Sequence, residues 1–185
     1  MEVIKTNIEG AIVVEPRVFG DERGYFFESF NAQEFAKQTG IEVNFVQDNE
    51  SKSKYGVLRG LHFQLPPYSQ SKLVRVVSGR VLDVAVDIRQ GSPTYGQWVS
   101  CELSGENHRQ FFVPKGFAHG FCVLSKEAVF QYKCDDFYHP EAEGALAWDD
   151  PDIGIEWPIP QADIILSEKD KHHPCFKDFV SPFIY

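Results

Sequence analysis

Residues 72–88 read KLVRVVSGRVLDVAVDI, and this stretch decides the class of fold. Its first part, 72–77, is rich in valine, which favours a strand. Residues 78–80, Ser-Gly-Arg, are typical of a turn. In 81–88 the acidic and small residues alternate with leucine, valine and isoleucine, which is the two-residue period of a strand. We therefore predict a strand, a turn and a second strand.

Short segments of the same kind recur along the chain. The further ranges predicted as strands are 24–30, 43–49, 57–63, 97–103, 110–113, 120–124 and 128–134. Many short strands separated by turns indicate a sandwich or barrel, and most of its pairs should be antiparallel. The predicted fold class is therefore all-β.

One short helix is predicted among these strands. Asn31 occupies the N-cap position, Glu34 completes a capping-box pattern, and Gly40 follows the last helical residue, Thr39. The 185 residues fit one domain. The last segment, 149–185, is interrupted by prolines, so we expect an ordered tail that wraps this domain and not a second domain.

Composition excludes several classes of function. The net charge is −9, from 18 basic and 27 acidic residues, which argues against a nucleic-acid partner. The four cysteines form no CxxC pair, the start of the chain does not resemble a signal peptide, and no apolar run approaches membrane-spanning length. We expect a cytoplasmic protein with reduced thiols and no membrane partner.

Two of the six histidines stand out as candidates for chemistry. His62 lies in a predicted strand, 58–64, and His119 lies in the segment 114–121, PKGFAHGF. The other four lie in polar, turn-like surroundings, and we expect them to be solvated: His108, His139, His172 and His173.

The second of these segments contains P-x-G-x-x-H, which is half of the cupin signature. Metal-binding cupins supply H-x-H at the other half, whereas this chain reads His62-Phe63-Gln64. Because the second imidazole is missing, we expect no metal site here. Two interpretations of His62 and His119 stay open: satisfied structural residues, or, for His62, a free acid–base group.

Parity along the strand predicts a local irregularity beside His62. Arg59 and His62 differ by three positions, so they point to opposite faces of a regular strand. Gly60 lies between them, and glycine is a natural site for a β-bulge. We predict a bulge that turns both side chains into the barrel.

Two further polar residues share a face with apolar neighbours. Lys72 is in phase with Val74 and Val76, so it should project into the same interior. Either it reaches water at the end of its strand, or it is a cation placed to stabilise an oxyanion. Tyr132 shares a face with Phe130, where a tyrosine is either a core residue or a proton donor.

Seven segments taken in order resemble the dTDP-4-dehydrorhamnose 3,5-epimerase family along nearly the whole chain. They are DERGYFFE (21–28), FVQDN (45–49), LRGLHFQ (58–64), KLVRV (72–76), PKGFAHGF (114–121), YKCD (132–135) with Tyr138, and LSEKD (166–170). The resemblance implies a single cupin-like domain over residues 1–185. Its fold would be a small antiparallel β-barrel, or jelly roll, with a few short helices.

The resemblance also implies roles for individual residues. His62 is the general base, oriented by Asp170. Tyr132 is the general acid on the opposite face of the sugar, and Lys72 stabilises an enolate. The implied substrate contacts are Gln47, Asn49, Arg59 and His119, and the implied nucleotide contacts are Arg23, Glu28, Tyr138, Glu143 and Lys169, with Tyr138 stacked on thymine.

The same resemblance implies the cofactors and partners. The reaction is epimerisation at C3 and C5 of a dTDP-4-keto-6-deoxyhexose, and it needs no metal and no redox cofactor. Family members are homodimers that exchange N-terminal strands, so Phe19 or Phe26 would reach the site of a neighbour.

Three other interpretations remain open at this point. A relative that epimerises C3 alone would share most of these residues. A metal-dependent cupin enzyme is disfavoured by Gln64, and a non-catalytic sugar-binding cupin is disfavoured by the presence of a base and an acid together. The identity of the nucleotide depends on the resemblance alone.

Overall fold

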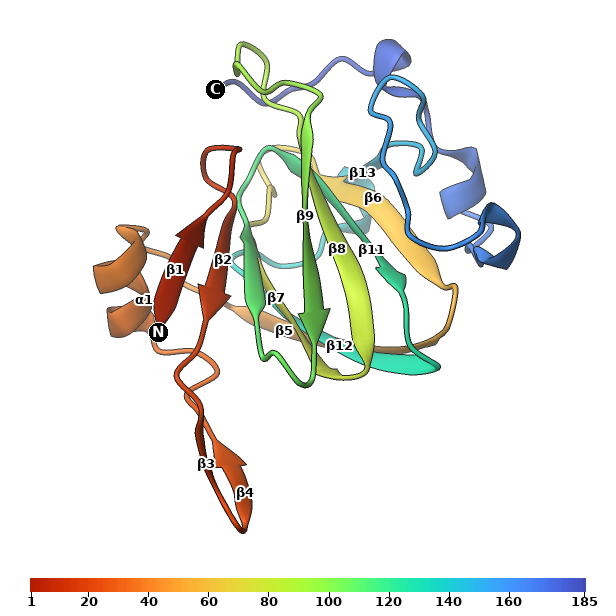
Figure 1. The fold of residues 1–185 in the computed structure, drawn as a ribbon. Helices are drawn as coiled ribbons and strands as arrows, with labels where there is room; N and C mark the ends of the chain where they lie inside the picture. The colour runs from red at the N-terminus through yellow and green to blue at the C-terminus, as the bar shows by residue number, and fades with distance from the viewer.

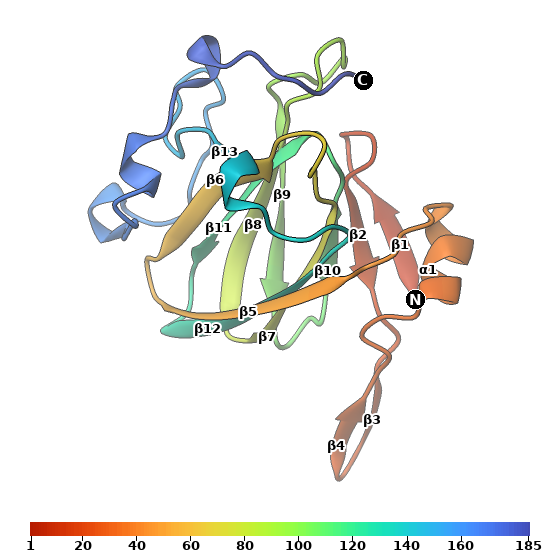
Figure 2. The same ribbon diagram turned by 180° about the vertical axis from the view of Figure 1, so that it is seen from behind.

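The computed structural model describes residues 1–185, and its strands form two antiparallel sheets that face each other across a barrel (Figures 1 and 2). The first sheet has the order β1 (Glu2–Lys5), β2 (Ile12–Glu15), β10 (Gln110–Val113), β7 (Lys72–Ser78), β12 (Glu127–Cys134) and β5 (Gln47–Lys54). The second has the order β13 (Glu143–Ala145), β6 (Leu58–Gln64), β11 (Phe117–Val123), β8 (Arg80–Asp87) and β9 (Trp98–Ser104). The predicted all-β, cupin-like barrel is confirmed.

The stretch 72–88 forms β7 and β8, with the predicted turn between them. The two strands belong to different sheets, so this turn is a corner of the barrel and not a hairpin within one sheet. Gly79 makes the corner with φ of 81°, and a Cβ atom there would lie 2.1 Å from the carbonyl oxygen of Glu127. Only glycine fits this position without a shift of the backbone.

The interior of the barrel is filled by apolar side chains from both sheets. Val74 and Val76 of β7 meet Phe121 of β11 and Phe130 of β12, and the two phenylalanine rings stack with centroids 4.1 Å apart. This packing excludes water from this part of the barrel interior.

The outer face of each sheet is also covered. Helix α1 (Ala32–Thr39) places Phe35 on the first sheet, and the C-terminal segment places Ile153 and Phe183 on the second. The alternation in 81–88 therefore separates two buried faces, because even Asp83 and Asp87 are fully buried. A strand covered on both sides has no solvent face.

The helix begins and ends as predicted. Asn31 Oδ1 accepts a hydrogen bond from the Glu34 amide at 3.1 Å, and Gly40 ends the helix with φ of 75°. The capping box is only half formed, because the Glu34 carboxylate accepts from Gln38 instead of from the amide of Asn31. None of the helices is long and apolar enough to cross a membrane.

Some predicted elements differ from the structure. Residues 27–30 and 43–46 are not strands, although they are rich in phenylalanine and valine, because several of their side chains pack around α1 instead of pairing their backbones. Strand β5 begins later than expected and continues to Lys54. Strands β1, β2, β3 and β13, of three or four residues each, were not predicted.

A hairpin arm projects away from the barrel (Figures 1 and 2). It consists of β3 (Phe19–Asp21) and β4 (Gly24–Phe26), which pair only with each other. Phe19 is 52% exposed and Phe26 is 67% exposed. Large aromatic side chains on a projecting hairpin are unusual for a surface that faces only water.

The C-terminal segment runs over the second sheet near β6 and β13 (Figure 1). Its three 3-10 helices each have a single turn: η2 (Gln161–Asp163), η3 (Asp170–His172) and η4 (Phe176–Asp178). Besides covering the sheet, this segment brings η3 against β6.

Candidate active site

The predicted β-bulge on β6 is confirmed. His62 lies opposite His119 of β11, while Arg59 lies opposite Phe121, so β6 has one residue more than β11 between these pairs. Because directly opposed residues share a face and Phe121 lies in the barrel interior, the bulge directs both Arg59 and His62 inward. Arg59 then donates hydrogen bonds to Ser53 Oγ on β5.

Two glycines permit this geometry. Gly60 has φ of 146°, and a Cβ atom there would lie 2.7 Å from the Cα atom of Gly120 on the neighbouring strand. A Cβ atom at Gly120 would in turn lie 2.7 Å from the carbonyl oxygen of Arg59. The strands can approach this closely only because neither position has a side chain.

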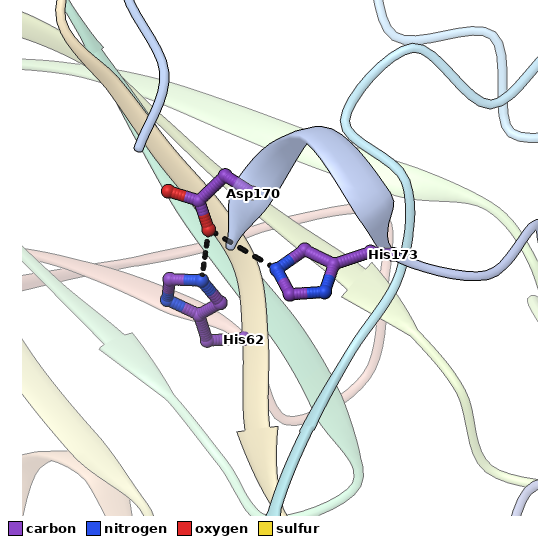
Figure 3. A group of neighbouring side chains, drawn as sticks. All are labelled: His62, Asp170 and His173. Carbon is purple, nitrogen blue, oxygen red and sulfur yellow. Dashed lines mark hydrogen bonds and ion pairs between the residues drawn. The ribbon is translucent and has the colours of Figure 1, made fainter. Parts of the chain in front are cut away.

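His62 is paired with a carboxylate from the C-terminal segment (Figure 3). Its Nε2 atom lies 2.6 Å from Asp170 Oδ1, although 108 residues separate the two in sequence. The His62 side chain is 31% exposed, and that of Asp170 is 5% exposed. The base candidate is therefore open to a ligand, while the carboxylate behind it is protected from water.

Asp170 accepts three side-chain hydrogen bonds. Ser167 Oγ donates to Oδ2 at 2.8 Å, and His173 Nε2 lies 3.1 Å from Oδ1, the oxygen that also pairs with His62. Burial raises the pKa of Asp170, but the hydrogen bonds from His62, Ser167 and His173 outweigh burial and lower the pKa to about 2. Asp170 is thus a carboxylate at neutral pH.

This pairing fixes the tautomer of His62. A carboxylate only accepts hydrogen bonds, so the ring proton of neutral His62 lies on Nε2 and is donated to Asp170. The other ring nitrogen, Nδ1, is then the basic atom. Asp170 also stabilises the imidazolium that forms when Nδ1 takes a proton.

Lys72 projects into the same interior, in phase with Val74 and Val76 as predicted. Its Nζ atom lies 5.9 Å from the centre of the Tyr132 ring. Burial lowers the pKa of Lys72, and the nearby carboxyl group of Asp83 opposes that shift. The structure thus places an amine in a poorly solvated position beside the tyrosine.

Tyr132 stands on the wall opposite His62, since β12 belongs to the first sheet and β6 to the second. Its ring packs against Phe130, with centroids 6.0 Å apart. Burial raises the pKa of the Tyr132 hydroxyl, so this group holds its proton at neutral pH. The barrel thus presents a basic nitrogen on one wall and a hydroxyl proton on the other.

His119 and Asp83 form a second histidine–carboxylate pair beside the first. His119 Nε2 lies 2.8 Å from Asp83 Oδ1, and both side chains are buried. Asp83 Oδ2 has no hydrogen-bond partner. Burial raises the pKa of Asp83, although His119 and Lys72 oppose this shift.

Asp83 was not among the functional residues predicted from the sequence. The signal was present, because Asp83 shares the interior face of β8 with the apolar residues Val81 and Ala85. An acidic residue between inward-facing apolar positions predicts a buried carboxylate that needs a partner.

The structure brings five of the other predicted contacts to the end of the barrel at which His62 and Tyr132 lie, which we call its mouth. Gln47 and Asn49 lie on β5, where Gln47 Nε2 donates to Asn49 Oδ1 at 3.0 Å, and the amide of Tyr138 donates to Gln47 Oε1 at 3.0 Å. Lys169, which precedes Asp170, pairs with Glu143 of β13. This ion pair raises the pKa of the Lys169 ammonium.

Three predicted contacts are not brought to this mouth within one chain. Arg23 and Phe26 lie on the projecting arm, where Arg23 pairs with Asp21. Glu28 accepts a hydrogen bond from Asn31 at the start of α1. The spacing of these residues along the sequence does not predict their distance from the mouth, because that distance depends on the direction in which the arm leaves the barrel.

The prediction that His173 is solvated was wrong. Its side chain is only 13% exposed, and its ring lies edge-on to that of His62 with centroids 5.6 Å apart. The neighbouring His172 is exposed, as expected. The spacing Asp170-x-x-His173 on one helical turn could have indicated this contact, since residues three apart on such a turn share a face.

Known proteins are similar to this chain in sequence and in fold. The sequence profile of the dTDP-4-dehydrorhamnose 3,5-epimerase family matches residues 5–178. A dTDP-4-dehydrorhamnose 3,5-epimerase of Shigella flexneri is 57% identical over 178 residues, which cover 96% of this chain and 97% of that protein.

Two solved structures have the same fold. The dTDP-6-deoxy-D-glucose-3,5-epimerase of Legionella pneumophila, in complex with dTDP-4-keto-L-rhamnose, has a TM-score of 0.92 and 53% identity, covering 95% of this chain and 93% of the other. A 3'-monoepimerase of Streptomyces bikiniensis in complex with dTDP-quinovose has a TM-score of 0.87 and 34% identity, covering 93% and 86%.

Proposed function

Because this chain belongs to the dTDP-4-dehydrorhamnose 3,5-epimerase family, we propose that it converts dTDP-4-dehydro-6-deoxy-D-glucose to dTDP-4-dehydro-L-rhamnose. The enzyme is an isomerase, and the reaction inverts C3 and C5 beside the C4 ketone. The observation that carries the residue assignments is the placement of His62 and Tyr132 on facing walls of one barrel. No metal or redox cofactor takes part.

His62 is the base in this proposal. Its Nδ1 atom removes the hydrogen from a carbon beside the ketone, and Asp170 stabilises the resulting imidazolium through the hydrogen bond of 2.6 Å. The exposure of His62 at the barrel mouth supports this role, because the atom that accepts the proton must reach the sugar.

Lys72 stabilises the enolate. Removal of the hydrogen leaves negative charge on the C4 oxygen, and a cation in a poorly solvated interior stabilises that charge far better than a cation in water. The position of Lys72 among Val74 and Val76, with Asp83 near it, supports this role.

Tyr132 returns a proton to the other face of the ring. Inversion requires that the proton arrive opposite to the side from which it left, and Tyr132 lies on the opposite wall with its proton in place. Arg59, Gln47, Asn49 and His119 contact the sugar or phosphates, since all four lie on the inner faces of their strands.

The nucleotide is bound at the mouth and by the arm of a second copy. Tyr138 is 50% exposed and stacks on thymine, close to Glu143 and Lys169. Arg23, Phe26 and Glu28 reach this nucleotide from the partner chain of a homodimer, because within one chain the arm points away from the mouth (Figure 1). The exposure of Phe26 supports this exchange.

Gln64 supports the assignment to metal-free chemistry at the second cupin position. Its amide nitrogen donates to the carbonyl oxygens of Tyr68 and Phe137, and its oxygen accepts from the amide of His139. Both ends of the side chain are engaged, so Gln64 acts as a structural brace and not as a ligand. A cytoplasmic location agrees with the four free cysteines.

The likeness to a 3'-monoepimerase, which has the same fold at 34% identity, favours a second candidate function, epimerisation at C3 alone. Proton NMR of the purified enzyme with dTDP-4-keto-6-deoxyglucose in deuterated water separates the two. We expect deuterium at both C3 and C5. Exchange at C3 alone would replace the proposal with the monoepimerase, and no exchange would contradict both.

A further inference from the structure

His62, Asp170 and His173 form a cluster of metal-ligand groups at the barrel mouth (Figure 3). We propose that these three side chains bind a zinc ion, and that the bound ion inhibits the enzyme by taking away its base. The ion is an inhibitor in this proposal and not a cofactor. The binding step depends only on the three side chains, and the inhibition rests on the proposed role of His62 as base.

The chemistry of the donors favours zinc. Two imidazoles and one carboxylate are a common set of protein ligands for Zn²⁺, with a fourth position left to water or another ligand. The ligand atoms all lie within 4.8 Å of one another. A tetrahedral zinc ion holds its ligands about 3.3 Å apart, so rotations that move these atoms by about 1 Å complete the site.

The surroundings hold the carboxylate ready for an ion. Ser167 Oγ donates to Asp170 Oδ2 and also accepts from the Asp170 amide, which orients the carboxylate and leaves Oδ1 toward both histidines. Such outer hydrogen bonds are what orients the ligands of established metal sites.

An ion can also reach the site. The His62 ring is 31% exposed at the mouth, and the His173 ring lies edge-on beside it. The overall charge of −9 favours the approach of a cation, although Lys169 lies nearby; its ammonium is paired with Glu143.

Zinc binding moves the ring proton of neutral His62 from Nε2 to Nδ1. In the metal-free enzyme the ring proton is on Nε2 and Nδ1 is the base. Zinc takes the lone pair of Nε2, so the one proton of the neutral ring then sits on Nδ1. Nδ1 can no longer accept a proton from the sugar, and the number of protons on the ring does not change.

Zinc binding is tested on the chelator-treated full chain without substrate, by calorimetric titration with ZnCl₂ and by the visible absorption of bound Co²⁺. We expect one ion per chain in the wild type. His173→Gln should weaken binding by more than the ~10–100-fold that a change in an outer hydrogen bond costs. Glutamine still donates to Asp170 but is a poor zinc ligand. The matched control is His172→Gln, which changes the exposed neighbour and should bind like the wild type.

Inhibition is tested by deuterium exchange from the substrate with and without ZnCl₂. We expect exchange to stop at one bound ion per chain and to return after addition of EDTA. Equal affinity of the wild type and His173→Gln would overturn the site. Full exchange in the zinc-loaded enzyme would overturn the inhibition. If zinc bound as expected but the metal-free enzyme showed no exchange, the proposed function would fail and the zinc site would stand.

Discussion

The barrel holds two histidine–carboxylate pairs on neighbouring strands, and the same two residue types behave differently in them. His62 and His119 lie directly opposite each other on β6 and β11, and each has its Nε2 atom against an aspartate. The His62 side chain is 31% exposed, whereas that of His119 is 8% exposed.

The two carboxylates differ even more than the histidines. Asp170 accepts from three donors and its pKa is lowered to about 2, whereas Asp83 has one donor, one unpartnered oxygen and a raised pKa. The difference shows that the number of hydrogen-bond donors, set against burial, decides in which direction the pKa of a carboxylate moves. A charged partner suits a base that must become an imidazolium, which supports the proposed role of the His62 pair.

Replacing each histidine in turn is the strongest test of whether the two pairs differ in function. We expect His62→Asn to lower kcat by ~10²–10⁴-fold, the usual contribution of a general base, and to abolish exchange of the substrate hydrogens with solvent. His119→Asn should lower kcat/KM by roughly 10-fold, through a lost hydrogen bond to the substrate, and exchange should persist. Equal losses in the two variants would show that the pairs are equivalent.

Tyr132→Phe tests whether the wall facing His62 supplies the returning proton. We expect inversion at C5 to fall by about 10²-fold or more, because the proton donor on that face is lost. Exchange at C3 should remain detectable, since His62 still removes the hydrogen. NMR of the product in deuterated water measures both effects; a normal rate with the normal product would exclude Tyr132 as the acid.

Asp170→Asn tests, through the free energy of unfolding, whether the Asp170 carboxylate is charged in the folded enzyme. A carboxylate with pKa lowered from 3.8 to about 2 stabilises the fold above pH 4, by on the order of 2 kcal/mol, and this contribution is lost between about pH 4 and pH 2. Urea unfolding at pH 6 should show that deficit in the variant. At pH 2.5 the difference from the wild type should shrink; a constant difference would point to lost packing instead of lost charge.

Asp83→Asn should give the smallest effect, with the opposite dependence on pH. The pKa of Asp83 is raised in the fold, so its protonation as pH falls stabilises the folded wild type relative to the unfolded chain. The wild type should therefore gain stability against Asp83→Asn as pH falls from neutral toward the ordinary pKa of 3.8. A gain in the reverse direction would show that Asp83 is held as a charged partner of His119 and Lys72.

Much of the barrel could be predicted from local sequence. The period of two residues placed Lys72 on the face of Val74 and Val76, and parity with Gly60 predicted the bulge that turns Arg59 and His62 inward. The strand ranges failed at 27–30 and 43–46, where apolar side chains pack on a helix without backbone pairing. A strand pattern reports which side chains are apolar, and it does not report the partner of the backbone.

The sequence alone was enough to predict the all-β class and the inward direction of Lys72 and Tyr132, because these follow from the alternation of side chains along a strand. It also predicted the turn at Gly79, but not that the chain changes sheets there. Resemblance to a family, and not spacing, indicated that Asp170 pairs with His62.

The behaviour of the charges depends on how the chain packs. The tertiary structure brought Asp170 and His173 across 108 and more residues of chain to His62, buried Asp83 with one oxygen unpartnered, and kept Arg23 and Phe26 on an arm away from the mouth. The physical reason is that burial and hydrogen-bond donors come from segments far apart in sequence, so the protonation of a group is a property of the packed chain.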